Sequence, residues 1–224
     1  NSPVTHRTCL APIVRHAELH FPPRRAYGMG MPATTDRYWT PADLAQFPER
    51  DGNRYECIGG ELFVTPSPRP VHVIAQELLR DELHQALRAA GESLRVFDAT
   101  QDFLPTAKDL VQPDLFVLRE RATASMRLDK TGCVVLIVEV LSPSTAARDR
   151  GIKRLLYQRA GVPEYWVVDV DARRIERWTP DASTAEICHD VIEWRDPVSE
   201  AVVRIDLPRF FAEVLDEGPP SAAR

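Results

Sequence analysis

An acidic residue interrupts the most apolar stretch of the chain. Residues 134–138 read VVLIV, and the stretch continues with Glu139, Val140 and Leu141. Burying a carboxylate without a cation or a hydrogen-bond donor costs several kcal/mol. Glu139 therefore either lies at a strand end, facing solvent or an arginine, or belongs to a functional site.

A second acid follows a proline inside another strand-like segment, LVQPDLFVL. Proline cannot donate to a sheet ladder, so Pro113 marks a bulge or a strand opening. Two acids on neighbouring strands can converge on one hard divalent ion, which prefers oxygen ligands. Asp114 and Glu139 are therefore a candidate metal-binding pair.

A basic segment, ARDRGIKRLLYQRAG, follows the strand that contains Glu139. Lysine is rare in this chain, because only three of its 28 basic residues are lysines, so Lys153 is an informative residue. The alternative is a solvated helix face on which Asp149 and Lys153, four residues apart, form an ordinary surface pair. Acids placed nearby would favour a phosphate-facing role instead.

The elements that must position these residues follow from hydrophobic period and capping signals. We expect a short helix at 40–47, a hairpin at 54–66 and a long helix from 67 or 70 to 91. Three strands within 93–104, 109–118 and 133–142 precede a second helix that begins at Ser144 or Thr145 and ends at Gly161. A strand, a turn near Asp171, further strands and a short helix reaching about 211 complete the pattern.

The predicted order from the long helix onward is helix, strand, strand, strand, helix, strand. The 142–162 connection demands a crossover between two parallel strands. We therefore predict an α/β protein of mixed α+β character, with a mixed central sheet and helices on its faces. Tyr157, Tyr165 and Trp166 are expected to pack in its core.

Length and charge restrict the classes of protein. With 224 residues and a net charge of −5, the chain suits one domain and shows no global attraction to nucleic acid. We expect a flexible extension over 1–36, one domain over 37–212 and a disordered tail over 213–224. No stretch is apolar enough for a membrane span or a secretory signal, which predicts a cytoplasmic protein without a membrane partner.

Familiar motifs are absent. The sequence lacks the phosphate-binding GxxxxGK[ST] and GxGxxG patterns, the zinc motif HExxH and the nucleophile motif GxSxG, so we expect no organic cofactor. Its four cysteines are isolated from one another, which argues against a zinc ribbon or a redox pair and favours free thiols. They are Cys9, Cys57, Cys133 and Cys188.

Several segments together resemble a known family. YECIGGEL, SPRPVHVIAQELLRDELHQAL, LVQPDLFVL and IVEVLSPSTAARDRGIKRLLYQRAGVPEYWVVD are similar to the Uma-two family of restriction endonuclease-like proteins, within the PD-(D/E)XK nuclease superfamily. The resemblance covers about 34–180 and is most specific over 137–169. It implies a restriction-endonuclease-like core of helix, strand, strand, strand, helix and strand.

The resemblance also implies roles for individual residues. Asp114 matches the acid of the superfamily PD, and Glu139 matches the acid of (D/E)XK, so both would bind Mg²⁺ or Mn²⁺. The lysine of that motif is missing, because Leu141 stands at its position. In the family pattern the lysine moves to the next helix, where it matches Lys153. Glu61 matches a further acid that would complete the catalytic site.

The implied partner is DNA. Arg148, Arg150 and Arg154 would contact its backbone, while His72 and Ser142 match positions close to the site. The implied reaction is endonucleolytic hydrolysis of a phosphodiester, stabilised mainly by positioning and electrostatics. A homodimer is expected, because cutting two strands takes two sites.

Two other functions fit the same residues. One is a nuclease-fold module that binds nucleic acid without turnover, which the displaced lysine and the acidic net charge favour. The other is a homodimeric interaction protein whose buried acids are structural. Metal binding that depends on Asp114 would separate the enzyme from both.

Overall fold

The structure is a computed structural model, and it describes residues 37–48, 51–89, 94–98, 102–119, 133–196, 198 and 202–217. The predicted N-terminal extension over 1–36 lies outside these residues, as does the tail beyond residue 217. The helices are α1 Pro41–Leu44, α2 Pro70–Ala89, α3 Ala146–Arg148, the π-helix η2 Asp149–Lys153, α4 Arg154–Arg159 and α5 Leu207–Val214.

Twelve strands accompany these helices in the described part of the chain. They are β1 Asn53–Ile58, β2 Glu61–Pro66, β3 Arg95–Asp98, β4 Phe103–Thr106, β5 Asp109–Val111, β6 Leu115–Leu118, β7 Val134–Val140, β8 Tyr165–Asp169, β9 Arg174–Trp178, β10 Glu186–Cys188, β11 Val191–Arg195 and β12 Val202–Asp206.

The central sheet is mixed. Its six strands run in the order β10-β9-β8-β7-β6-β3, and β7 and β8 are parallel, with Glu139 opposite Val167. The neighbouring pairs are antiparallel. A second sheet, β2-β1-β5-β4, begins with the predicted hairpin, in which Glu56 pairs with Phe63. The predicted parallel crossover is confirmed.

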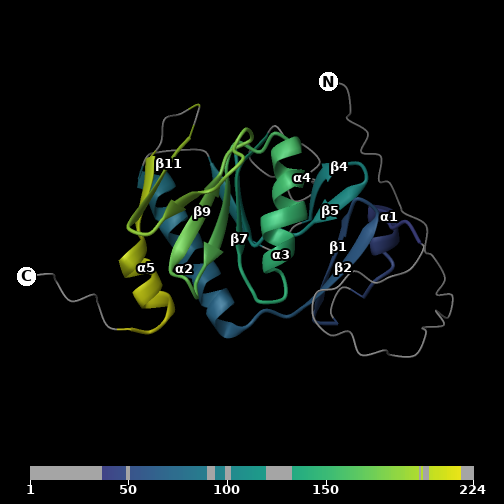
Figure 1. The fold of residues 1–224 in the computed structure, drawn as a ribbon, viewed down its shortest axis with the longest axis horizontal. Helices are drawn as coiled ribbons and strands as arrows, with labels where there is room; N and C mark the ends of the chain where they lie inside the picture. Colours follow the sequence, from purple (N-terminus) through teal and green to yellow (C-terminus); the bar gives the residue numbers. More distant parts are fainter. Residues whose placement is uncertain are drawn as a thin grey trace, which may run out of the picture.

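Helices cover both faces of the central sheet, as side-chain alternation along its strands requires. On β6, Leu115 and Val117 join a core cluster that contains the buried residues of α2 and α5. Phe116 and Leu118 face the other way, into a cluster with Leu156 and Tyr157 of α4. Figure 1 places α5 and β11 at one end of the molecule and α1, β1 and β2 at the other. The mixed fold class is confirmed.

Two predicted strands are each divided. The segment 93–104 holds β3 and part of β4, and the segment 109–118 holds β5 and β6. In the second sheet β5 pairs with β1, and β4 pairs with β5. Pro113 lies at the break between β5 and β6, where its missing N–H ends the ladder. Next to this break, the Asp114 carboxylate accepts a hydrogen bond from the Val140 backbone N–H at 2.8 Å.

The crossover helix is irregular. The sequence predicts one regular helix from 144 or 145 to 161, whereas the structure inserts the π-turn η2 between α3 and α4. A π-turn bonds residues five apart, widens the helix and is frequent at functional sites. Here it places Asp149 and Lys153 on the same buried side.

The boundary predicted at residue 212 falls inside an element. Helix α5 continues to Val214, which is buried in the core, and Leu215 packs against it. Asp206 caps the helix by accepting a hydrogen bond from the Arg209 backbone at 2.9 Å. The short helix expected near 211 therefore extends over Leu207–Val214 and is part of the core.

The aromatic residues pack as predicted: Tyr157, Tyr165 and Trp166 are all buried. Cys57, Cys133 and Cys188 form no disulfide, while Cys9 lies outside the described residues. Across the described ranges, none of the helices has the length and apolar character to traverse a bilayer.

Candidate functional site

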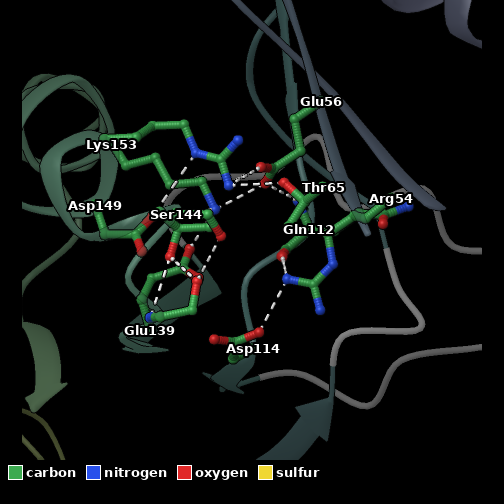
Figure 2. Close-up of polar contacts among 12 residues, drawn as sticks. Arg54, Glu56, Thr65, Gln112, Asp114, Glu139, Ser144, Asp149 and Lys153 are labelled. Carbon is green, nitrogen blue, oxygen red and sulfur yellow. Dashed lines mark hydrogen bonds and ion pairs between the residues drawn. The ribbon is translucent and has the colours of Figure 1, made fainter. Parts of the chain in front are cut away.

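Four buried acids gather where β1, β6, β7 and the crossover helix meet. Figure 2 shows polar side chains from these separate elements pointing toward one another. The acids face three cations, so the formal charge of the cluster is −1 when every acid is ionised. The acids are Glu56, Asp114, Glu139 and Asp149, and the cations are Arg54, Arg148 and Lys153.

Asp114 is held at both carboxylate oxygens. Its Oδ1 accepts a hydrogen bond from Arg54 at 2.9 Å, while its Oδ2 bonds to the Val140 backbone and lies 3.2 Å from His72 Nε2. Burial alone would raise the pKa of this carboxyl, but the contacts with His72 and Arg54 outweigh it and lower the pKa well below its usual range. Asp114 is therefore ionised at neutral pH.

Lys153 links two strands of different sheets. Its ammonium group lies 2.7 Å from Glu139 Oε1 on β7 and 2.7 Å from Glu56 Oε1 on β1. Tyr157 donates a further hydrogen bond to Glu139 Oε1 at 2.9 Å, and the Gln112 backbone donates one to Glu56 Oε1 at 3.0 Å. The side chains of Lys153, Glu139, Glu56 and Tyr157 are all buried, so their electrostatic interactions are poorly screened by solvent.

Lys153 pairs with both Glu56 and Glu139, but the pKa values of these two carboxyl groups are shifted in opposite directions. Burial works against the charge of Glu56, yet Lys153, Arg148 and Arg54 lower its pKa. Burial, together with neighbouring acids such as Asp114, raises the pKa of Glu139 to about 8 despite Lys153. Burial also opposes the charge of Lys153, but Glu139 and Glu56 raise its pKa above the ordinary value, so it stays cationic.

The π-turn supplies the remaining polar groups. Arg148 lies 3.3 Å from Glu56 Oε2 and donates to Thr65 Oγ1 on β2 at 3.0 Å. Asp149 approaches Lys153 at 4.0 Å and the Arg148 Nε at 3.8 Å, both beyond hydrogen-bonding distance. The contacts of Arg148 with Glu56 and Thr65 connect the crossover helix to the β1–β2 hairpin.

A pocket of about 290 Å³ opens onto this cluster, lined by all of its acids except Glu56. Asp149 Oδ1 and Arg148 Nε are buried and make no hydrogen bond within the described residues. Buried polar groups normally have partners, so such atoms indicate room for water or a ligand. The contacts of Glu139 with the described chain go to Oε1, which leaves Oε2 for a ligand in the pocket.

The donor set fits a divalent metal ion. Mg²⁺ is commonly bound by one or two carboxylates together with waters and substrate phosphates. Asp114 and Glu139 both line the pocket and provide such carboxylates. No group of three His, Cys, Asp or Glu side chains within the described ranges is arranged to hold a metal by itself. Water or substrate oxygens would therefore complete the coordination.

The structure brings together most of the residues that the sequence singled out. Asp114, Glu139 and Lys153 meet as described, and His72 and Ser142 line the same pocket. Glu61 does not join them: it is exposed at the start of β2, opposite Ile58.

The three arginines expected to contact DNA do not form one surface. The Arg148 side chain is 7% exposed and lies in the site, where it forms an ion pair with Glu56 and donates a hydrogen bond to Thr65. Arg150 is half-buried and pairs with Glu176 and Asp169.

Arg154 is also engaged within the protein. It donates to Gln158 at 2.8 Å and lies over the ring of Trp178. Arg148 and Arg150 thus pair with acids of the protein, whereas Arg154 contacts neutral groups.

Sequence reasoning missed Glu56 and treated Asp149 as a possible surface partner. Asp149 and Lys153 are both buried, so the surface-pair interpretation is wrong. Glu56 had the same signal as Glu139: an acid between apolar residues in a predicted strand, YECI. Arg54, two residues earlier on the same strand, carried no signal of its own.

Comparison with solved structures shows that this fold has been observed before. The chain resembles the crystal structure of "a putative nuclease belonging to DUF820" from Anabaena variabilis, with a TM-score of 0.63 and 16% sequence identity. The match covers 79% of this chain and 99% of that one. The central sheet and its covering helices thus define a restriction-endonuclease-like core.

A family model identifies the chain more closely. The Uma2 model, described as "Putative restriction endonuclease", matches residues 41–207. The chain belongs to this family. The match includes every residue of the buried cluster. No curated protein matches the chain.

Proposed function

We propose that the chain is a divalent-metal-dependent endonuclease that hydrolyses phosphodiester bonds of DNA. The observation that carries this proposal is the convergence of Asp114 and Glu139 on one pocket, with Lys153 2.7 Å from Glu139, in a chain of the Uma2 family. Asp114 and Glu139 would hold Mg²⁺ or Mn²⁺. Such an ion supplies Lewis-acid polarisation of a phosphoryl oxygen and a lower pKa for bound water.

The other side chains position and stabilise charge. Lys153 remains protonated, because its pKa is raised, so it acts as a hydrogen-bond donor and a fixed positive charge rather than as a base. Negative charge that grows on the phosphoryl oxygens of the transition state is stabilised by such a charge in a buried site. Tyr157 and Glu56 hold Lys153 and Glu139 in place.

The test begins with metal binding, because it does not require knowing the DNA target. Calorimetric titration of Mn²⁺ is expected to show binding to the wild-type protein and loss of binding in Asp114→Asn, with an unchanged circular dichroism spectrum. Plasmid and linear DNA are then incubated with Mn²⁺, and wild type but not Asp114→Asn is expected to cut them. Absence of Mn²⁺ binding and of cleavage by the wild type would overturn the proposal.

One observation favours a second candidate, a nuclease-fold module that binds nucleic acid without cutting it. Lys153 lies 2.7 Å from both Glu139 Oε1 and Glu56 Oε1, which gives each carboxylate a cationic partner without a metal. This candidate predicts salt-sensitive DNA binding that needs no Mn²⁺ and leaves the DNA intact.

A homodimer is part of the proposal, because cutting both strands of a duplex takes two sites. Sedimentation velocity is expected to show a species of twice the chain mass, 25.3 kDa. A monomer that nicks one strand at a time would contradict the dimer without contradicting the nuclease.

A further inference from the structure

A ridge separates the pocket above the acidic cluster from a second pocket. The ridge consists of Arg69, His72, Ser142 and Pro143, which line both pockets. The second pocket has a volume of about 240 Å³, and neither Asp114 nor Glu139 lines it. A group bound on the ridge is therefore a neighbour of the reacting group rather than the reacting group itself.

Arg69 on this ridge forms no ion pair within the described part of the chain. It is exposed, and none of the described acids forms an ion pair with its guanidinium. Its backbone carbonyl accepts hydrogen bonds from the His72 and Val73 backbones in the first turn of α2. Arg54, Arg148 and Arg150, by contrast, all pair with acids of the protein.

The position of Arg69 is unfavourable for helix stability. The N-terminal end of a helix carries partial positive charge, so a cation there weakens the helix and an anion there strengthens it. Arg69 immediately precedes α2, a helix of 20 residues. An anion bound beside Arg69 would interact favourably with both the guanidinium and the helix end.

A second group on the ridge also lacks a partner. His72 is 8% exposed, and its Nδ1 makes no hydrogen bond within the part of the chain that the structure describes. Its Nε2 faces Asp114 at 3.2 Å, so the ring connects the acidic cluster with the ridge. A buried ring nitrogen without a partner, in a residue that lines the same two pockets as Arg69, indicates a polar ligand there.

The residues that line the two pockets indicate whether a nucleic acid would be bound through its bases or through its phosphates. The residues described around the two pockets include no Phe, Tyr or Trp side chain. Proteins that bind single strands through their bases normally use such surfaces. Charged contacts to phosphate fix register without reading sequence.

We infer that the ridge binds the phosphate next to the scissile one, with Arg69 as its principal contact, and that the second pocket takes the flanking nucleotide. This inference rests on the proposed nuclease function and deepens it. Arg69 is a binding and positioning residue for a polymeric phosphodiester. It contacts the phosphate backbone of the nucleic acid and not the bases.

Arg88 provides a matched control. It is an exposed arginine of the same helix, but it lies in the last turn, at the other end of α2. Wild type, Arg69→Ala, Arg69→Lys and Arg88→Ala are compared by fluorescence anisotropy with a short labelled DNA of mixed sequence, in EDTA and over a series of salt concentrations. Steady-state cleavage with Mn²⁺ provides KM and kcat, and calorimetry provides Mn²⁺ affinity.

Arg69→Ala is expected to weaken DNA binding and raise KM roughly tenfold, as the loss of a charge-assisted contact requires. The slope of log affinity against log salt should fall by about 0.9 for a duplex or about 0.7 for a single strand. Arg69→Lys should retain most of the wild-type salt dependence of DNA affinity, and Arg88→Ala should retain all of it. Mn²⁺ affinity and kcat should stay unchanged, and the Tm of Arg69→Ala should not fall.

The outcomes separate the two hypotheses. If the wild type binds or cuts DNA and Arg69→Ala matches Arg88→Ala in affinity, slope and KM, the ridge inference is wrong and the nuclease proposal stands. If the wild type neither binds nor cuts DNA, the proposed function fails and the ridge inference fails with it. Parallel loss of Mn²⁺ binding in Arg69→Ala would also overturn the inference, because it would indicate a general disturbance of the site.

Discussion

The ammonium group of Lys153 lies 2.7 Å from Glu139 Oε1, although the two residues are 14 positions apart in the chain. The position two residues after Glu139, where the superfamily motif carries its lysine, is occupied by Leu141. The lysine that contacts the Glu139 carboxylate is instead Lys153 of the crossover helix, which follows β7 in the chain. A lysine that is distant in sequence thus provides the cationic partner of Glu139.

Removal of this lysine should destabilise the protein. In Lys153→Met the buried Glu56 loses its closest cation, and loss of one partner of a buried ion pair costs about 3–5 kcal/mol. Urea unfolding followed by circular dichroism measures the change. Addition of Glu56→Gln to Lys153→Met should recover part of the lost stability, because the uncompensated charge is removed. Additive losses in the double variant would show that the two side chains are not coupled.

The pH dependence of stability should report Glu139. Its pKa is raised from 4.5 in the unfolded chain to about 8 in the folded protein. Between these values the folded state binds the extra proton, so the contribution of Glu139 to stability falls as pH rises through this window. Glu139→Gln should lose that contribution to the pH dependence.

Urea unfolding at pH values from 5 to 8.5, in the absence of divalent metal, provides the comparison. A wild-type curve parallel to that of Glu139→Gln across the range would contradict the raised pKa. Asp114 has the opposite sign: its pKa is lowered, so its contribution is lost only as the pH falls below the usual range of the carboxyl.

Glu56 and Glu61 form a matched pair of acids on one hairpin. Glu56 is buried against Lys153, whereas Glu61 is exposed. Glu56→Gln should lower kcat for DNA cleavage by at least about tenfold, because a neutral amide no longer fixes the lysine charge at the reacting group. Glu61→Gln should leave kcat and Tm unchanged. An equal loss of activity in Glu61→Gln would show that the exposed acid reaches the substrate.

Gly151 in the π-turn should tolerate a side chain. A Cβ at this position has no neighbour within 4 Å, and the glycine does not need a positive φ. Gly151→Ala should therefore raise the free energy of unfolding by about 0.5–1 kcal/mol, because alanine loses less conformational entropy in a helix. Thermal and urea unfolding measure this. A fall in stability would indicate that the π-turn depends on the flexibility of glycine.

Local patterns predicted much of the architecture. The stripe of α2, the hairpin at β1–β2 and the apolar strand β7 follow from side-chain period and turn residues, which act over a few positions. The parallel pairing of β7 and β8 follows from the chirality of crossovers, which is also insensitive to sequence detail. The division of 109–118 at Pro113 was signalled by the proline itself.

The sequence by itself determined which acids would be costly to bury, as Asp114 and Glu139 illustrate, and it placed Lys153 on the helix between β7 and β8. Only the tertiary structure decided their partners. The contact of Glu56 with Lys153 joins the β1–β2 hairpin to the crossover helix, and the π-turn sets which side of that helix is buried. Such long-range pairings depend on how whole elements pack, because burial and electrostatic compensation are properties of the assembled core and not of any local segment.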